Sequence, residues 1–451
     1  MHSKDPYRIT EDTILAAPTT FKERIKHLGP SLILSAAIVG SGELIATTTL
    51  GARAGFTAFW VILLGCLIKV LVQVEFAKHT ILTGNTPMKS LNELPGRKFG
   101  KAHWSVWFVL FIMLTKLIQV GGIIGGVAII LNMLFPQIDL MIFAFGMAVL
   151  VAALVYRGYY HFIEKTSIWL IAFFTIFTFT SLYFLKYTPY AISFSQVLSG
   201  LTFELPAAHL VAVFGAFGIT GVGGDEIIYY NYWCLEKGYA ANTGPKEASI
   251  DWQTRAKGWI KVMELDAIFA MIIYTTVTAA FYLLGAAVLS NQDSLPEGYE
   301  MVEQLSKMYT LSLGEGARYF FYFGAFVVLF STLFAALAAW TRQISDTFGQ
   351  IGWIDFSDLK VRKKSIAILA WVIPMLWATF FMFMKVPVLM VLIGGVTGSA
   401  LLFLVVYAVI YFRYYDTPAA FKPRRVYDMF LWLSILSIAV IGASGIWKAV
   451  F

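Results

Sequence analysis

Two short glycine-rich runs, each ending in an acidic residue, are the parts of this sequence best suited to bind a cation. Their residues are Gly40, Ser41, Gly42 and Glu43 in the first run, and Val222, Gly223, Gly224 and Asp225 in the second. Carboxylate oxygens, completed by carbonyl oxygens freed from a broken helix, suit a hard cation. The two runs therefore predict one substrate site, in which Glu43 and Asp225 are the metal-binding carboxylates.

A second acid, Glu226, follows Asp225 directly. Adjacent helical residues point about 100° apart, so we expect only one of these two carboxylates to face the solute, and we assign Asp225 to that role. Two alternatives stay open for the runs. The glycines could serve close helix packing, and Glu43 and Asp225 could cap the half-helices that follow the glycines.

The composition places both runs in lipid. Apolar residues make up 59% of the chain and charged residues 14%, whereas soluble domains have about 45–50% and about 25%. Backbone groups freed within hydrocarbon are costly unless something satisfies them, so a broken helix is tolerated where it lines a polar cavity. The sequence therefore predicts an all-α membrane protein whose broken helices form its substrate site.

Eleven mainly apolar stretches are long enough to cross a bilayer, which takes roughly 20 residues. We expect transmembrane helices near residues 29–50, 56–76, 104–135, 138–156, 163–185, 208–234, 260–290, 317–341, 365–384, 387–412 and 427–449. The glycine runs fall in the first and sixth stretches. Interrupted helices at matching points of two halves are typical of transporters built as an inverted repeat.

This pattern predicts four parts along the chain and one orientation. The parts are a cytoplasmic segment at 1–27, a first five-helix repeat at 28–190, a second five-helix repeat at 205–413 and an eleventh transmembrane helix at 426–451. Lys and Arg concentrate in alternate loops, which places the N-terminus in the cytoplasm and the C-terminus outside. We therefore expect a multi-pass protein of the cell membrane, with the lipid bilayer as its surroundings.

Two lysines, Lys69 and Lys116, lie inside predicted spans, where an unpaired charge is costly. We expect them to form internal ion pairs with the acids of the breaks, or to take part in coupling together with Glu226. Ionisable groups at this depth are candidates for function by default.

Other classes of function find little support. The net charge of +7 is spread over the loops and not gathered on one face, which argues against nucleic acid as a partner. The two cysteines lack the spacing of a metal site or a disulfide framework. No nucleophile–base arrangement suggests an enzyme, and the sequence points to no cofactor and to no particular oligomeric state.

Several motifs resemble the NRAMP metal-ion transporter family, over about residues 25–412. They are Gly29-Pro30, Ser35 to Glu43, Gly51 to Phe56, Trp60 to Leu64, Gln73, Thr83-Gly84, Leu131 to Phe135 and Glu264-Leu265-Asp266. The resemblance implies the LeuT-type fold, a five-plus-five inverted repeat with helices one and six broken. That expectation agrees with the spans and breaks read from the residues themselves.

The expected site departs from the family pattern. The family's Asp-Pro-Gly-Asn falls on the run that ends at Glu43, and its Met-Pro-His falls on the run that ends at Asp225. The acidic pair of the family's third helix falls on Val120 and Ile123. This chain lacks the methionine of the family's Met-Pro-His motif. Without that sulfur ligand the site loses its preference for softer metals, which favours a hard, Mg²⁺-like cation. We expect the small glycines to give that hydrated cation a wide site.

The sequence thus predicts a secondary transporter or carrier of a small solute, with a divalent metal cation as the leading substrate. An alternative is a small organic solute, an amino acid or an amine, because exposed half-helix N-termini also bind substrate carboxylates. A third possibility, from another class, is a solute sensor that does not transport.

Overall fold

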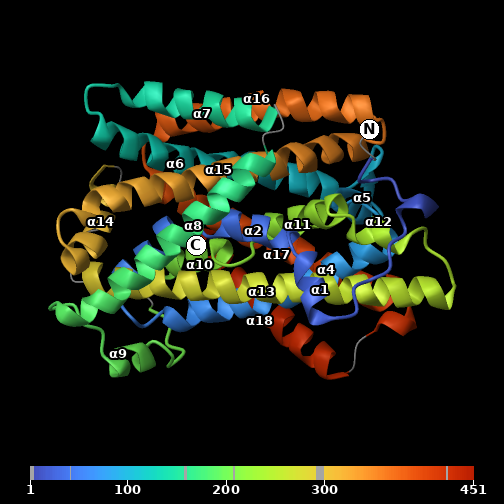
Figure 1. Ribbon diagram of the computed structural model, residues 1–451, viewed down its shortest axis with the longest axis horizontal. Coiled ribbons are helices and arrows are strands. Elements are labelled where there is room, and N and C mark those ends of the chain that lie inside the picture. The colour runs from blue at the N-terminus through green and yellow to red at the C-terminus, as the bar shows by residue number, and fades with distance from the viewer. Residues whose placement is uncertain are drawn as a thin grey trace.

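In the computed structural model, the described residues are 5–40, 42–156, 160–206, 209–290, 299–422 and 425–450. Long helices dominate and run roughly along one axis (Figure 1). The longest are α4 (Phe59–Thr83), α6 (Trp104–Leu134), α7 (Leu140–Tyr156), α8 (Tyr160–Phe184), α13 (Ile250–Leu289), α15 (Ala317–Ile351), α16 (Leu359–Met384), α17 (Pro387–Tyr411) and α18 (Arg425–Val450).

The first and sixth spans are each divided, as the glycine runs predict. The first consists of α2 (Pro30–Ile38), the π-helical segment η2 (Gly42–Thr47) and α3 (Thr48–Ala54). The sixth consists of α10 (Leu210–Ile219) and α11 (Gly224–Glu236). Both expected helix breaks are therefore present.

Short elements connect the spans. They are α1 (Phe21–Lys26), α5 (Pro87–Asn92), α9 (Phe194–Ser199), α12 (Tyr239–Thr243), α14 (Tyr299–Leu313), the 3-10 turns η1 (Glu11–Thr13), η3 (Leu185–Tyr187) and η6 (Ala419–Phe421), and the π-helical turn η5 (Phe412–Asp416). Two strands, β1 (Lys98–Phe99) and β2 (Ala102–His103), pair antiparallel with Lys98 opposite His103.

Every predicted span overlaps a helix, or in the first and sixth spans a pair of half-helices. Within the described residues, eight helical segments are long and apolar enough to cross a membrane. The segment α7 is apolar but shorter. The number of eleven spans therefore stays a prediction, while the mostly helical membrane architecture is confirmed.

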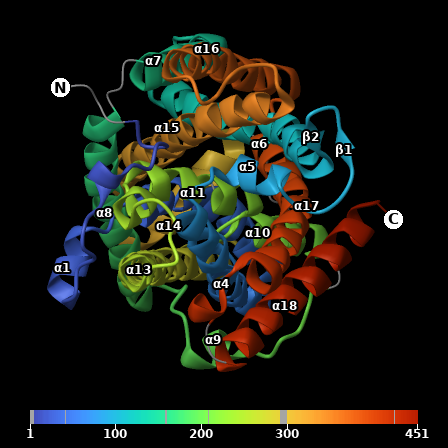
Figure 2. The same ribbon diagram turned by 90° about the vertical axis from the view of Figure 1, so that its right-hand side faces the viewer.

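The broken spans lie in the middle of the molecule. The helix α13 packs against α2, α3 and α4, α15 packs against α2 and α6, and α17 packs against α6, α10 and α11. The pair α7 and α16 lies along one edge, and α18 lies outside α4 and α17 (Figures 1 and 2). The two divided spans are thus enclosed by unbroken helices, away from lipid.

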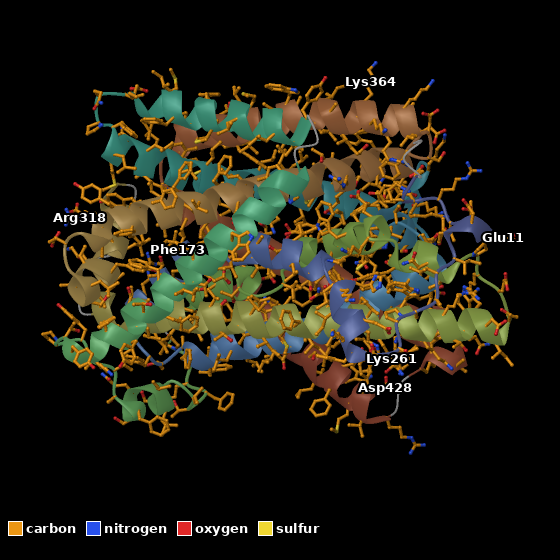
Figure 3. All side chains as sticks on the ribbon, viewed as in Figure 1. Glu11, Phe173, Lys261, Arg318, Lys364 and Asp428 are labelled. Atoms are coloured by element: carbon orange, nitrogen blue, oxygen red, sulfur yellow. The ribbon has the colours of Figure 1, made fainter. Side chains whose placement is uncertain are left out.

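The labelled side chains in Figure 3 show the two ends of this bundle. Glu11, in the N-terminal segment, and Arg318, at the start of α15, lie at opposite ends of the long axis. Lys261 and Lys364 lie nearer the Glu11 end (Figure 3). Charged residues from distant parts of the sequence therefore lie toward the same end of the bundle.

Two glycines bring α3 and α13 into direct backbone contact. A Cβ atom on Gly51 would lie 2.5 Å from the carbonyl oxygen of Tyr282, and one on Gly285 would lie 2.5 Å from the carbonyl oxygen of Thr48. Small residues allow such close approach between helices in membranes. This contact fixes α3, the second half of the first span, against α13.

We expect Gly51→Ala to destabilise the protein by about 1–3 kcal/mol, because the added methyl must push the backbone of α13 away. Thermal unfolding in detergent would show a lower midpoint. The matched control is Gly146→Ala on α7, where a Cβ atom would meet nothing within 4 Å. Equal midpoints for both variants would contradict the close contact between α3 and α13.

Candidate functional site

A small cavity lies between the two breaks. It has a volume of about 30 Å³, and its polar lining is Gln119 of α6, Asp225, Glu226 and Tyr229 of α11, and Thr332 of α15. About 10–15 Å³ of such volume holds one water molecule. The cavity therefore has room for about two waters, fewer than a hydrated cation carries.

Asp225 lines this cavity from the first turn of α11 and forms an ion pair with Lys116 of α6. Both side chains are buried, each with 3% of its surface exposed. The internal ion pair that the sequence predicts for Lys116 is therefore present. The helix N-terminus also stabilises an anion at this position, through its free N–H groups and its dipole.

The capping role falls on Glu226 and not on Asp225. The backbone N–H of Gly223 donates a hydrogen bond to Oε2 of Glu226, which closes the first turn of α11. Asp225 pairs with Lys116 instead, and what remains of the capping alternative is the favourable position of its charge at the helix N-terminus. Glu226 also lines the cavity, so both adjacent acids reach it, although we expected only one to do so.

Glu43 is completely buried but is not part of the cavity lining. Its Oε1 accepts a hydrogen bond of 2.8 Å from the hydroxyl of Thr278 on α13, and its Oε2 accepts one of 3.3 Å from the N–H of Gly40. The carboxylate satisfies the backbone at the break in the first span. The cavity thus brings together Asp225 and Glu226, while Glu43 faces α13.

Lys69, on α4, holds the other side of the break in the sixth span. Its ammonium donates hydrogen bonds to the carbonyl oxygens of Phe217 and Thr220, the latter at 2.9 Å, and lies 4.4 Å from the centre of the Phe217 ring. The C-terminal end of a helix favours a cation, because its last carbonyl groups are unpaired. Backbone carbonyls are therefore its direct partners, where the sequence predicts an acid.

The glycines of the two runs allow close packing and do not widen the site. A Cβ atom on Gly40 would overlap the hydroxyl of Thr332, and one on Gly224 would lie 2.8 Å from the backbone nitrogen of Leu402 on α17. A Cβ atom on Gly42 would lie 2.9 Å from Ile219. The expectation of a wide site is wrong for this conformation, and the packing alternative describes these glycines.

Further residues lie in the two runs or close to them. Val222 is completely buried in the turn between α10 and α11. Gly221 makes that turn with φ +65°, a conformation that favours glycine, and lies against Cys66 of α4, with 3.3 Å between its ideal Cβ position and the Cys66 sulfur. Cys234 is also buried, further along α11. Ser41 lies outside the described residues.

Sequence reasoning missed the neutral polar residues that line the cavity. The carbonyl oxygen of Gln119 is buried and has no hydrogen-bond partner among the described residues. The hydroxyl of Thr332 donates a hydrogen bond of 3.3 Å to the carbonyl oxygen of Ala37, near the end of α2. Gln119 could have been identified from the sequence, because a polar amide in the middle of an apolar span is unusual. Nothing in the sequence distinguishes Thr332 in the same way.

Asp266 of α13 anchors the start of the first span. It accepts hydrogen bonds from the N–H groups of Gly29 and Ser31, both at 2.9 Å, and from the hydroxyl of Tyr230 on α11 at 3.0 Å. This one carboxylate thus joins α2, α11 and α13. It positions the two half-helices that carry the site.

Metal ligands at the cavity would have to include neutral oxygens. In the part of the chain that the structure describes, no three His, Cys, Asp or Glu side chains gather closely enough to hold a metal ion. Asp225, Glu226 and Gln119 line the cavity and carry side-chain oxygens, the kind of ligand that hard cations prefer.

The family model for natural resistance-associated macrophage protein-like proteins matches residues 31–448. An uncharacterized protein of Pasteurella multocida is 24% identical over 352 residues, which cover 74% of this chain and 73% of that protein. The divalent metal cation transporter MntH of Caldanaerobacter subterraneus is 25% identical over 293 residues, covering 63% of this chain and 64% of that protein, just under two thirds.

Two solved structures share the fold. A manganese transporter of Eremococcus coleocola superposes with a TM-score of 0.63 at 16% identity, covering 96% of this chain and 90% of that one. The nucleobase-cation-symport-1 family transporter Mhp1, in a closed conformation with a bound hydantoin, has a TM-score of 0.57 at 15% identity, covering 95% and 91%. These likenesses confirm the LeuT-type fold.

We expect Lys69→Met to lower stability, because it leaves two buried carbonyl groups at the end of α10 without their donor, at about 1–3 kcal/mol for each unsatisfied group. Thermal unfolding in detergent measures the loss. Lys186→Met is the control, since that ammonium is exposed above Tyr183 and Tyr187. If the two variants unfold at the same temperature, Lys69 does not hold the break.

Proposed function

The chain belongs to the natural resistance-associated macrophage protein-like family, and we propose that it is a secondary transporter that carries a divalent metal cation across the membrane. The observation that supports this most directly is the buried carboxylate of Asp225, which lies at the start of the half-helix α11 in a cavity that Gln119 also lines. A carboxylate at the start of a half-helix, beside a polar amide side chain, can supply oxygen ligands to a cation.

We propose Asp225 as the principal ligand, with Gln119 and the second carboxylate, Glu226, beside it. The described lining contains no sulfur atom. Softer transition metals gain affinity from sulfur ligands, whereas Mg²⁺ and similar hard cations bind oxygen. A hard divalent cation is therefore the substrate class that this lining favours.

Glu43 takes a positioning role in this proposal. Its two oxygens already accept from Gly40 and Thr278, which hold the break of the first span against α13. A carboxylate committed to two donors has less capacity left for a cation than Asp225 has. Transport would then involve movement of the half-helices α2 and α11 against the unbroken helices, as in other inverted-repeat transporters.

The finer organisation is also a proposal. We place the N-terminus in the cytoplasm and the C-terminus outside, in the cell membrane, with the cytoplasmic segment at 1–27, the repeats at 28–190 and 205–413, and the eleventh helix at 426–451. The division of the first and sixth spans at corresponding points supports the two repeats. Basic residues at the Glu11 end support the orientation (Figure 3).

A small organic solute is the second candidate. The cavity has an apolar wall that includes Val120, Ile219 and Trp340, and pockets for organic ligands are mostly apolar. The transporter Mhp1, which has the same fold, was solved with an organic compound bound. A volume of about 30 Å³ favours an ion over such a solute in this conformation.

We expect purified protein in proteoliposomes to take up at least one of Mg²⁺, Mn²⁺ and Ca²⁺ above protein-free vesicles. Asp225→Asn should lower that uptake by about tenfold or more, since the loss of even an indirect partner of a bound metal typically costs 10–100-fold. The control is Asp251→Asn, an exposed acid in the first turn of α13. Uptake of none of the three cations by folded protein would favour the organic solute.

Glu43→Gln should separate a positioning role from a ligand role. We expect it to lower the uptake rate. The dissociation constant of the cation, measured by calorimetry, should change by less than about threefold, which is well below the tenfold change that about 1.4 kcal/mol of binding free energy produces. Thr278→Val should have the same effect, and the double variant should add little, because the two groups share one hydrogen bond. Binding as weak as in Asp225→Asn would make Glu43 a ligand.

A further inference from the structure

The ion pair between Lys116 and Asp225 places a positive charge on the proposed cation ligand. Lys116 lies on α6, one turn before Gln119, and reaches Asp225 on α11. Both members of the pair are almost completely buried. Any cation that binds to Asp225 from solution must therefore separate it from the ammonium group of Lys116.

We propose that Lys116 is a tethered competitor for the cation at Asp225, and that this competition makes the site selective for divalent over monovalent cations. The inference rests on the proposed function, because it assigns Asp225 to cation binding. It adds a residue that sets specificity without being a metal ligand.

The selectivity follows from the charges. A monovalent ion carries the same charge as the ammonium group, so it gains no Coulomb energy from the exchange and still has to leave its hydration shell. A divalent ion attracts the carboxylate about twice as strongly at the same distance. The tethered lysine is also present at a high effective concentration, which a free monovalent ion has to overcome.

The surroundings of Lys116 allow the exchange. Its long side chain is flexible and its ammonium has three rotatable donors. Glu226 is a second carboxylate within electrostatic range of Lys116, so the displaced ammonium keeps a partner. On the α17 side, Gly398 lies next to the ammonium without a side chain of its own: its ideal Cβ position is 3.5 Å from the lysine nitrogen.

A purely structural role makes the opposite prediction. If Lys116 only neutralises a buried acid, its removal leaves an uncompensated charge, which is strongly destabilising. The variant would then unfold at a lower temperature and bind every cation more weakly. If Lys116 is a competitor, its removal frees Asp225 for cations from solution.

The experiment is calorimetric binding of Mn²⁺ and Mg²⁺ to the full chain in detergent, comparing the wild type with Lys116→Met, which keeps the side chain long but removes its charge. Each titration is repeated with about 150 mM NaCl and with the same concentration of N-methylglucamine chloride, so that ionic strength is equal and screening is matched. Any difference in the dissociation constant between the two salts therefore reports a specific effect of Na⁺ and not of ionic strength.

We expect Lys116→Met to bind the divalent cation about tenfold more tightly than the wild type, because a competitor has been removed. We also expect Na⁺ to weaken binding in this variant and not in the wild type. Lys116→Arg, which keeps the charge, should retain the insensitivity to Na⁺. The double variant Lys116→Met with Asp225→Asn should lose the tight binding.

The matched control is Lys78→Met. Lys78 is also a buried lysine, and it is paired with Glu75 at 2.5 Å. It lies on α4, whereas Lys116 lies on α6, and it is not among the residues that line the cavity. Its removal should leave the dissociation constants and their response to Na⁺ unchanged. An equal gain of affinity in both lysine variants would overturn the inference, because it would reflect net charge alone.

The outcomes separate the inference from the function on which it rests. If the wild type binds divalent cations and Lys116→Met binds them no more tightly, or shows no response to Na⁺, the inference is overturned and the proposed function stands. If neither protein binds any of them, the proposed function is overturned and the inference with it. Tighter binding with a new sensitivity to Na⁺ supports both.

Discussion

The interior of this protein depends on one constraint: backbone groups freed by the two helix breaks need polar partners within the membrane. Glu43 satisfies the N–H of Gly40, Glu226 satisfies that of Gly223, and Lys69 satisfies the carbonyl groups at the end of α10. These three charged side chains are thereby committed to the backbone at the breaks. Asp225 differs from these residues, since its partner is a lysine and not the backbone.

This division of roles explains why some of the site could be predicted and some could not. The spans and both breaks follow from the length of the apolar stretches and from the position of the glycine runs. Which of two adjacent acids caps a half-helix depends on side-chain rotamers, so the sequence offered Asp225 as a possible cap, whereas the structure has Glu226 in that role. The partners of Lys69 come from a helix about 150 residues away and leave no local signal.

The glycines carry a related lesson. The same glycine run can line a cavity or allow another helix to pack closely. Which of the two occurs depends on the residues that face the glycines, and these are distant in the sequence. Thr332 stands opposite Gly40, and the backbone of α17 stands opposite Gly224. The resemblance to the NRAMP family likewise gave the fold, since packing of long helices tolerates many substitutions. It did not give the ligands, because those depend on single residues that this chain has replaced.

The two cysteines of the chain have a practical consequence. Cys66 lies against the turn at Gly221 and Cys234 is buried in α11, so both thiols belong to the neighbourhood of the broken sixth span. A thiol reagent can reach them only through a state in which that span separates from the helices around it. The unmodified chain therefore carries its own chemical reporters of opening, and labelling kinetics can be followed without introducing a single new cysteine.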